Sequence, residues 1–257
     1  MIYMALPEEH EFFKTIIYLL TTAYKTLLRG LSITLLLAIV GTLGGFVLAF
    51  VFLYLKMLKP DKKRDRTLKK IFKKIGYHFA NAYITVVRGT PMIVQAIIVY
   101  YGLSPYLNKA IWTPLFAGLF IIVFNTAAYI AEILRSGING IDIGQYEASR
   151  SLGFNHFKTN LYIIYPQAIK NSLPAIANEF IVNLKDSSVL FAIGIMDLYN
   201  AGNAASSANY RKVEAFIIVA LIYLFLTMIT SKLITYLENR NLRSLKNAWD
   251  NKSRKFI

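Results

Sequence analysis

Residues 30–55, GLSITLLLAIVGTLGGFVLAFVFLYL, carry no charged side chain and decide the fold class. About 20 consecutive apolar residues allow a helix to cross a bilayer. Two further uncharged runs, Gly89 to Asn108 and Ala110 to Ala131, meet the same condition. The three runs predict three membrane-spanning helices, because an ordinary soluble core would break its apolar residues into amphipathic periods.

Two other segments are predicted to span the membrane with a less regular composition. Ala215 to Ser231 is shorter, but apolar residues extend it on both sides. Ser172 to Met196 has a suitable length but contains Glu179, Lys185 and Asp186. A charge at the bilayer centre costs roughly 2.5 to 3.5 kcal/mol, so these side chains should face protein or a water-filled cavity. We therefore predict an all-α polytopic membrane protein with five transmembrane helices.

The charge of the chain is uneven and predicts its orientation. The 257 residues are 56% hydrophobic, yet 29 Lys and Arg stand against 14 Asp and Glu, a net charge of +15. Ten basic residues lie between Lys56 and Lys74 and six between Glu238 and Ile257, so both segments should be cytoplasmic. Two segments on the same side of the membrane must have an even number of spans between them. Four spans between the loop and the tail, and one before the loop, give five spans and an amino terminus outside. The basic excess then indicates contact with anionic membrane lipids and no nucleic-acid partner.

Three regions follow along the chain. Residues 1–29 are predicted as an external amphipathic helix, because apolar residues from Phe12 to Leu28 recur at helical spacing. Residues 30–237 form the transmembrane domain, including a cytoplasmic loop at 136–170, and residues 238–257 form a basic cytoplasmic tail. A weaker pattern at Ile71 to Phe79 predicts a second interfacial helix.

The second span begins with Arg88-Gly89-Thr90-Pro91, followed one turn later by Gln95. Pro91 removes a backbone donor and Gly89 adds freedom, so a helix should start or kink here. The segment is either a helix start with Arg88 anchored at the cytoplasmic interface, or a place where freed backbone groups and Thr90 line a pathway.

Polar side chains form a ladder along the fourth span. Glu179, Asn183 and Asp186 are spaced four and three residues apart, so they share one helix face. Ionisable groups inside a membrane mark pathways by default, and carboxylates with amides would suit a small zwitterion or cation. Alternatively, Lys185 neutralises a carboxylate of its own helix or of a neighbour.

The loop at 136–170 contains two short helical patterns, Tyr146 to Leu152 and Phe157 to Ile164. Gly153 suits a left-handed helix end, and Asn155 can cap the helix that follows. Two helices joined by a turn favour a docking surface, with a self-packed loop as the alternative.

Small residues recur four apart within two of the spans. Gly41 with Gly45, and Ala127 with Ala131, would let helix backbones approach closely. Packing within the subunit is the preferred interpretation, and a contact between subunits is the alternative.

These motifs resemble those of a known family. Glu147-Ala148-Ser149, Gly153 and Ile163-Ile164-Tyr165-Pro166 resemble the EAA motif of ABC importer permeases. Arg88-Gly89-Thr90-Pro91 with Gln95, and Asn183 to Ser188, are similar to signatures of the polar amino-acid branch. Ser149 stands where the pattern has Ala, and Tyr165 where it has Leu.

The resemblance implies the type I importer permease fold in a bacterial cytoplasmic membrane. It implies a second permease subunit, identical or different, two cytoplasmic ATP-binding subunits and an extracytoplasmic amino-acid-binding protein. The residues expected to couple to the ATPase are Glu147, Ala148, Arg150, Leu152 and Gly153. Those expected along the substrate path are Arg88, Gly89, Thr90, Met92, Gln95, Asn125, Glu179, Asn183, Asp186 and Ser187.

The chain has no phosphate-binding loop of the form G-x-x-x-x-G-K-[ST], so ATP and magnesium should be bound by the partner, and no cofactor is expected here. It has no Cys, and His10, His78 and His156 lie on different segments, so a membrane enzyme is the least supported class. Arginine, lysine or histidine is the expected substrate, with glutamine or cystine open. The alternative is a stand-alone secondary transporter or channel that uses the intramembrane carboxylates.

Overall fold

The computed structural model describes residues 11–58 and 67–253; helices joined by short connections and no strand occur in these ranges, which confirms the all-α prediction. The elements in chain order are α1 (Phe12–Thr22), α2 (Tyr24–Met57), α3 (Thr67–Gly89), α4 (Met92–Leu103), α5 (Pro114–Asn139), α6 (Ile143–Ser151), α7 (His156–Thr159), the π-helix η1 (Asn160–Ile164), α8 (Tyr165–Asp186), the 3₁₀-helix η2 (Ser187–Ile193), α9 (Leu198–Asn209) and α10 (Lys212–Ser253). Parts of the predicted external helix (1–10), basic loop (59–66) and basic tail (254–257) lie outside the described residues.

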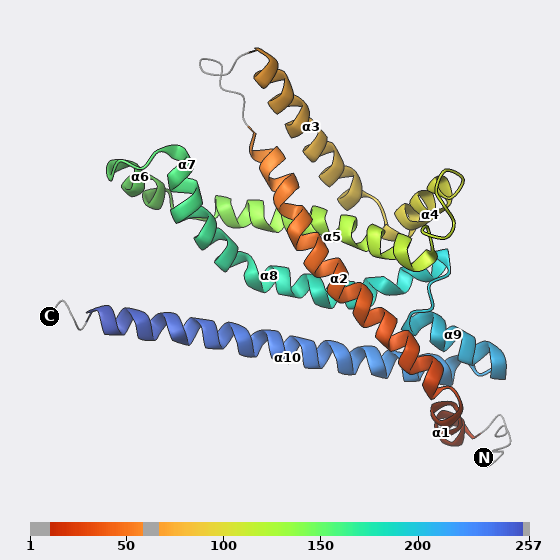
Figure 1. Ribbon diagram of the computed structural model, residues 1–257. Coiled ribbons are helices and arrows are strands. Elements are labelled where there is room, and N and C mark those ends of the chain that lie inside the picture. The colour runs from red at the N-terminus through yellow and green to blue at the C-terminus, as the bar shows by residue number, and fades with distance from the viewer. Residues whose placement is uncertain (1–10, 59–66, 254–257) are drawn as a thin grey trace.

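The long helices run between two ends of the molecule (Figure 1). One end, which we call the α6–α7 end, holds those two short helices and the carboxyl-terminal part of α10. The other, the α9 end, holds α1, α4 and α9. Helices α2 and α5 pack against each other most extensively, and α8 packs against both.

Glycines on α2 allow its close approach to α5. A Cβ atom at Gly45 would lie 2.8 Å from the Cβ of Thr126, and one at Gly41 would lie 3.0 Å from Cγ1 of Ile122. A Cβ at Gly45 would require the neighbouring helix atoms to shift, and one at Gly41 would require the Ile122 side chain to give by a few tenths of an ångström. Packing of this glycine pair within the subunit is confirmed.

Three helices are individually long and apolar enough to cross a membrane among the described residues: α2, α5 and Lys212–Leu237 of α10. Helices α3 and α4 meet the condition only together, with a bend of 114° between them. Helix α8 has 22 residues but a polar composition. The count of five spans therefore stays a prediction, with α8 as its polar member.

The structure corrects the bounds of the second span. A single helix from Gly89 to Asn108 is wrong, since α3 ends at Gly89 and α4 covers only 12 residues, about 18 Å. The predicted break at Gly89 to Pro91 is confirmed. The predicted interfacial helix at Ile71 to Phe79 is the middle of α3, because its lysines gather on one face of a longer helix.

Other predicted bounds shift as well. The amino-terminal helix ends at Thr22, and residues from Tyr24 onward belong to α2, after a break at Ala23. Helix α10 continues past position 237 to Ser253, so no break separates the predicted membrane domain from the predicted tail. The loop expected at 136–170 is shorter, because α5 extends to Asn139 and α8 starts at Tyr165.

Candidate functional site

Side chains of Gln95 and Thr90 close the break between α3 and α4. Gln95 Nε2 donates to the carbonyl oxygens of Val87 at 2.8 Å and Thr90 at 2.9 Å. Thr90 Oγ1 donates to the carbonyl oxygen of Val86 at 2.8 Å. The carbonyl of Val87 has no helical donor, because position 91, four residues later, is a proline without a backbone N–H, and the other two lie at the end of α3. Gln95 Oε1 also accepts from Asn125 Nδ2 of α5 at 3.0 Å. The predicted motif is thus a hydrogen-bonded corner fixed to α5.

Arg88 ends a helix instead of beginning one. It lies about 30 Å along α3 from Thr67, so it is not the anchor at the start of a span that the sequence allowed. Its guanidinium lies over the ring of Tyr129, 5.5 Å from the centroid, and 3.9 Å from Oε1 of Glu132. Arg88, Gly89 and Thr90 are exposed, and Met92 is half-buried.

Glu132 of α5 is the centre of an ion cluster that the sequence analysis did not single out. Its Oε2 is 2.8 Å from Nζ of Lys56 on α2, and its Oε1 is 3.0 Å from Nε of Arg135. With Arg88, the carboxylate thus joins α2, α3 and α5. The sequence does carry a signal for this cluster: Glu132 directly follows the uncharged run Ala110 to Ala131, and Arg135 lies three positions later, at the spacing of a helical ion pair.

The polar residues of α8 divide into two groups. Asn183, only 3% exposed, accepts from Thr126 Oγ1 at 3.0 Å and donates to Thr42 Oγ1 at 2.9 Å, so it joins α8 to α5 and α2. Ser187 is fully buried and donates to the carbonyl oxygen of Leu184 at 3.0 Å. The hydrogen-bonding groups of both side chains are used within the subunit.

Glu179 and Asp186 form the second group and are half-buried. Glu179 interacts electrostatically with Asp186 and with Arg88 of α3. Lys185 is exposed and forms no ion pair shorter than 4.0 Å within the described ranges 11–58 and 67–253, but it interacts electrostatically with Asp186 of its own helix, so its role as a counter-ion stays an alternative. The face therefore presents two carboxylates and one guanidinium, which together can bind the ammonium and carboxylate of an amino acid. The same ranges contain no group of His and acidic residues that could hold a metal ion.

The predicted turn between two short helices is confirmed at the α6–α7 end. Gly153 has φ of +84°, the left-handed conformation expected of a helix end. Asn155 Oδ1 accepts from the amide of Lys158 at 2.8 Å and caps α7, and Asp142 Oδ1 accepts from the amide of Gly144 at 2.6 Å and caps α6.

One face of α6 is fixed to α7 and the other is exposed. Ser149, only 4% exposed, is hydrogen-bonded to Thr159 Oγ1 at 3.0 Å, so the residue that departs from the family pattern holds the two helices together. Arg150 donates to the carbonyl oxygen of Phe154 at 2.7 Å across the turn. Glu147, Ala148 and Gly153 are exposed, and two large apolar side chains accompany them: Leu152, 79% exposed, and Ile143, 73% exposed. Exposed apolar groups on a fixed helix indicate a docking surface.

A buried carboxylate organises the α9 end. Asp197 lies after η2 and caps α9 by accepting from the amides of Asn200 at 3.1 Å and Tyr199 at 3.3 Å. It also accepts from the hydroxyl of Tyr223 on α10 at 3.3 Å. Burial raises the pKa of this carboxyl to about 6, although these hydrogen bonds oppose the shift.

Comparison with known proteins places these features in a family. Residues 67–243 match the family described as "Binding-protein-dependent transport system inner membrane component". The chain is 36% identical to the arginine transport system permease protein ArtQ of Bacillus subtilis (strain 168), covering 86% of this chain and 92% of that one. It is 31% identical to the glutamine transport system permease protein GlnP of Escherichia coli (strain K12), covering 85% and 94%. A crystal structure of an amino acid ABC transporter with histidines is 36% identical, covers 90% of this chain and 98% of that chain, and has a TM-score of 0.76.

Proposed function

Because this chain belongs to the family of binding-protein-dependent transport system inner membrane components, we propose that it couples amino-acid passage to a separate ATPase through the exposed face of α6. The chain is a permease subunit of an amino-acid ABC importer, a membrane component and not an enzyme. Family membership does not favour the alternative of a stand-alone secondary transporter or channel.

The exposed carboxylate of Glu147 is the observation that supports coupling. It projects from a helix whose opposite face is held by Ser149, between exposed Ile143 and Leu152. A rigid helix with an apolar rim and a central charge is suited to fit a groove of a partner. On this proposal the α6–α7 end is cytoplasmic and the amino terminus lies outside. Two cytoplasmic subunits hold ATP and magnesium, and an extracytoplasmic protein delivers the substrate.

The test of coupling is a charge reversal on α6. We expect Glu147→Arg to abolish the stimulation of ATP hydrolysis by loaded binding protein in a reconstituted complex, because the partner groove would meet a reversed charge. Glu147→Gln, which removes the charge without reversing it, is the comparison variant and should reduce stimulation less. Undiminished stimulation in the Glu147→Arg complex would refute the coupling role.

For the substrate we propose an amino acid with a cationic side chain. Glu179 and Asp186 supply two carboxylates, one for the α-ammonium group and one for a cationic side chain, while Arg88 suits the substrate carboxylate; Lys185 interacts with Asp186 from the exposed side of the same helix. Names of the relatives include both arginine and glutamine transport, so the excess carboxylate is the feature that favours a cation. Glu179 and Asp186 are only half-buried in one subunit, and on this proposal a second permease subunit completes the path.

Uptake by proteoliposomes containing the complex tests this assignment. We expect Glu179→Gln to reduce uptake of labelled arginine about tenfold or more, while uptake of glutamine, where it occurs, changes far less. Glu11→Gln serves as the charge control. Equal losses for both amino acids would contradict a charge-reading role of Glu179 without bearing on coupling through α6.

A further inference from the structure

One face of α5 lies behind the corner between α3 and α4. Asn125, Tyr129 and Glu132 are spaced four and three residues apart, so they lie on the same side of α5. Asn125 Nδ2 donates to Gln95 Oε1 at 3.0 Å. Tyr129 and Glu132 both contact Arg88. The corner is thus held against a single helix at three positions of one face.

The guanidinium of Arg88 keeps its hydrogen-bond donors unused. Its Cζ lies 5.5 Å from the ring centroid of Tyr129, within the range of a cation–π interaction. Its Nη1 is 3.9 Å from Oε1 of Glu132, which is too long for a hydrogen bond. Within residues 11–58 and 67–253 this side chain donates no hydrogen bond, and it is 42% exposed. The fork of N–H groups is therefore available to a carboxylate.

Glu132 is not the contact that fixes the position of Arg88. Its carboxylate already accepts from Lys56 at 2.8 Å and from Nε of Arg135 at 3.0 Å. The longer pair with Arg88 lies at an exposed guanidinium, where an ion pair contributes little. The planar guanidinium stacks well on aromatic faces. The ring of Tyr129 is therefore the contact that holds the group in place.

Arg88 is also attracted from α8. Glu179 interacts with it electrostatically, yet the two form no ion pair within 4.0 Å. We propose that Tyr129 is a positioning residue, whose ring keeps the guanidinium of Arg88 apart from Glu179 and available to the carboxylate of the substrate. This inference rests on the proposed function, in which Arg88 binds that carboxylate.

An aromatic ring suits this task better than a charged side chain. The face of a ring attracts a cation but brings no full negative charge that would compete with the substrate carboxylate. Without the ring of Tyr129, Arg88 would turn toward Glu179 and neutralise it. The substrate would then lose its partner for the carboxylate and one of its partners for the cationic groups. Tyr129 thus maintains the separation of opposite charges that a zwitterion needs.

Equilibrium dialysis of labelled arginine against the purified complex of permease and ATPase subunits, without binding protein, tests this role. We expect Tyr129→Leu to weaken arginine binding about two- to fivefold, the effect of a cation–π contact at an exposed site. Tyr129→Phe keeps the face of the ring and should bind arginine as the unmodified chain does. Tyr129→Met also lacks a ring and replaces the leucine variant if that one does not assemble.

Agmatine, which is arginine without its carboxylate, separates positioning from a general loss of structure. Its affinity should be the same in Tyr129→Leu and in the unmodified chain, because it has no group for Arg88 to bind. Equal losses for arginine and agmatine, or a loss in Tyr129→Phe as large as in Tyr129→Leu, would overturn the proposal.

Arg88→Gln distinguishes this inference from the proposed function. It should weaken arginine binding at least as much as Tyr129→Leu does. A loss in Arg88→Gln with none in Tyr129→Leu would refute the positioning role alone. Unchanged arginine binding in Arg88→Gln would refute the carboxylate role of Arg88 and the positioning role with it. Coupling through α6 is tested independently by Glu147→Arg.

Discussion

Asn183 gives the sharpest test of how α8 is built. Replacing it by Leu keeps the approximate volume but removes its hydrogen bonds to Thr42 and Thr126, which are 2.9 and 3.0 Å long. Hydrogen bonds between membrane helices average about 0.6 kcal/mol and reach about 1.7 kcal/mol, so losing two should cost roughly 1 to 3 kcal/mol. The threonine hydroxyls can turn to carbonyls of their own helices, which keeps the cost within this range.

Unfolding of the purified chain by titration with dodecyl sulfate measures this cost. Asn178→Leu is the matched control, because Asn178 is exposed on the same helix and should change stability little. A double-mutant cycle with Thr42→Val should return a coupling energy of roughly 0.5 to 1.5 kcal/mol for that hydrogen bond. The arginine-to-glutamine uptake ratio should stay unchanged in Asn183→Leu. A stability loss no larger than that of Asn178→Leu, or a changed uptake ratio, would show that Asn183 acts in the path and not in packing.

Two further predictions concern charged groups outside α8. Glu132→Gln should lower the free energy of unfolding by roughly 2 kcal/mol, because Lys56 and Arg135 lose a charged acceptor in a half-buried site. In the same titration, Lys56→Gln should lower the free energy of unfolding less in the Glu132→Gln variant than in the unmodified chain. The carboxyl of Asp197 has a pKa of about 6 in the folded chain and an ordinary pKa of 3.8 when unfolded. Because the folded state holds the proton more tightly, stability should fall as pH rises from about 4 to about 6. Melting temperatures measured across this pH window should fall for the unmodified chain and stay level for Asp197→Asn, which keeps the helix cap but does not titrate. The same pH dependence of the melting temperature in both would contradict the raised pKa of Asp197.

Local patterns in the sequence were sufficient for the elements that depend on local chemistry. The turn at Gly153 follows from the left-handed conformation that Gly adopts without strain, and Asn155 caps the next helix through its own side chain. The helix break at Pro91 follows from a missing backbone donor. The start of α3 was missed because its lysines interrupt the apolar run, although they lie on one face of a continuous helix.

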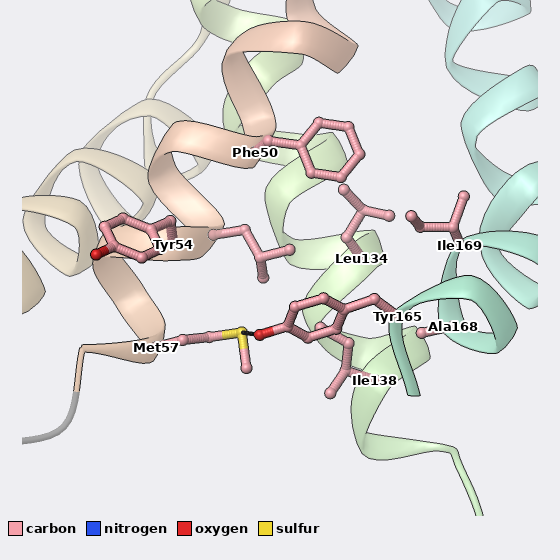
Figure 2. A pocket seen from close by; sticks show the side chains of 9 residues that line it. Phe50, Tyr54, Met57, Leu134, Ile138, Tyr165, Ala168 and Ile169 are labelled. Carbon is pink, nitrogen blue, oxygen red and sulfur yellow. Dashed lines mark hydrogen bonds between the residues drawn. The ribbon is translucent and has the colours of Figure 1, made fainter. Parts of the chain in front are cut away.

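The partners of the polar side chains could not be derived in this way. Asn183 and Glu179 share a predicted helix face, yet Asn183 is buried against Thr42, 141 residues away in the chain, while Glu179 stays half-buried. Helical spacing defines a face but not the helix that covers it. The same holds for the apolar cavity that Tyr165 lines (Figure 2), whose walls come from α2, α5 and α8.

The ion cluster at Glu132 links the two parts of the site through one helix. Helix α5 ends at Asn139, three residues before the cap of α6 at Asp142, so α6 cannot move far without moving the end of α5. Glu132 lies two turns back along α5, and its carboxylate is 3.9 Å from Arg88 at the corner between α3 and α4. A push on α6 by the proposed ATPase would thus reach Arg88 through rigid helix and charge contacts, without passing through the hydrogen bonds of Asn183. Glu132→Gln should therefore reduce stimulated transport more than Asn183→Leu does, even where the two variants lose equal stability.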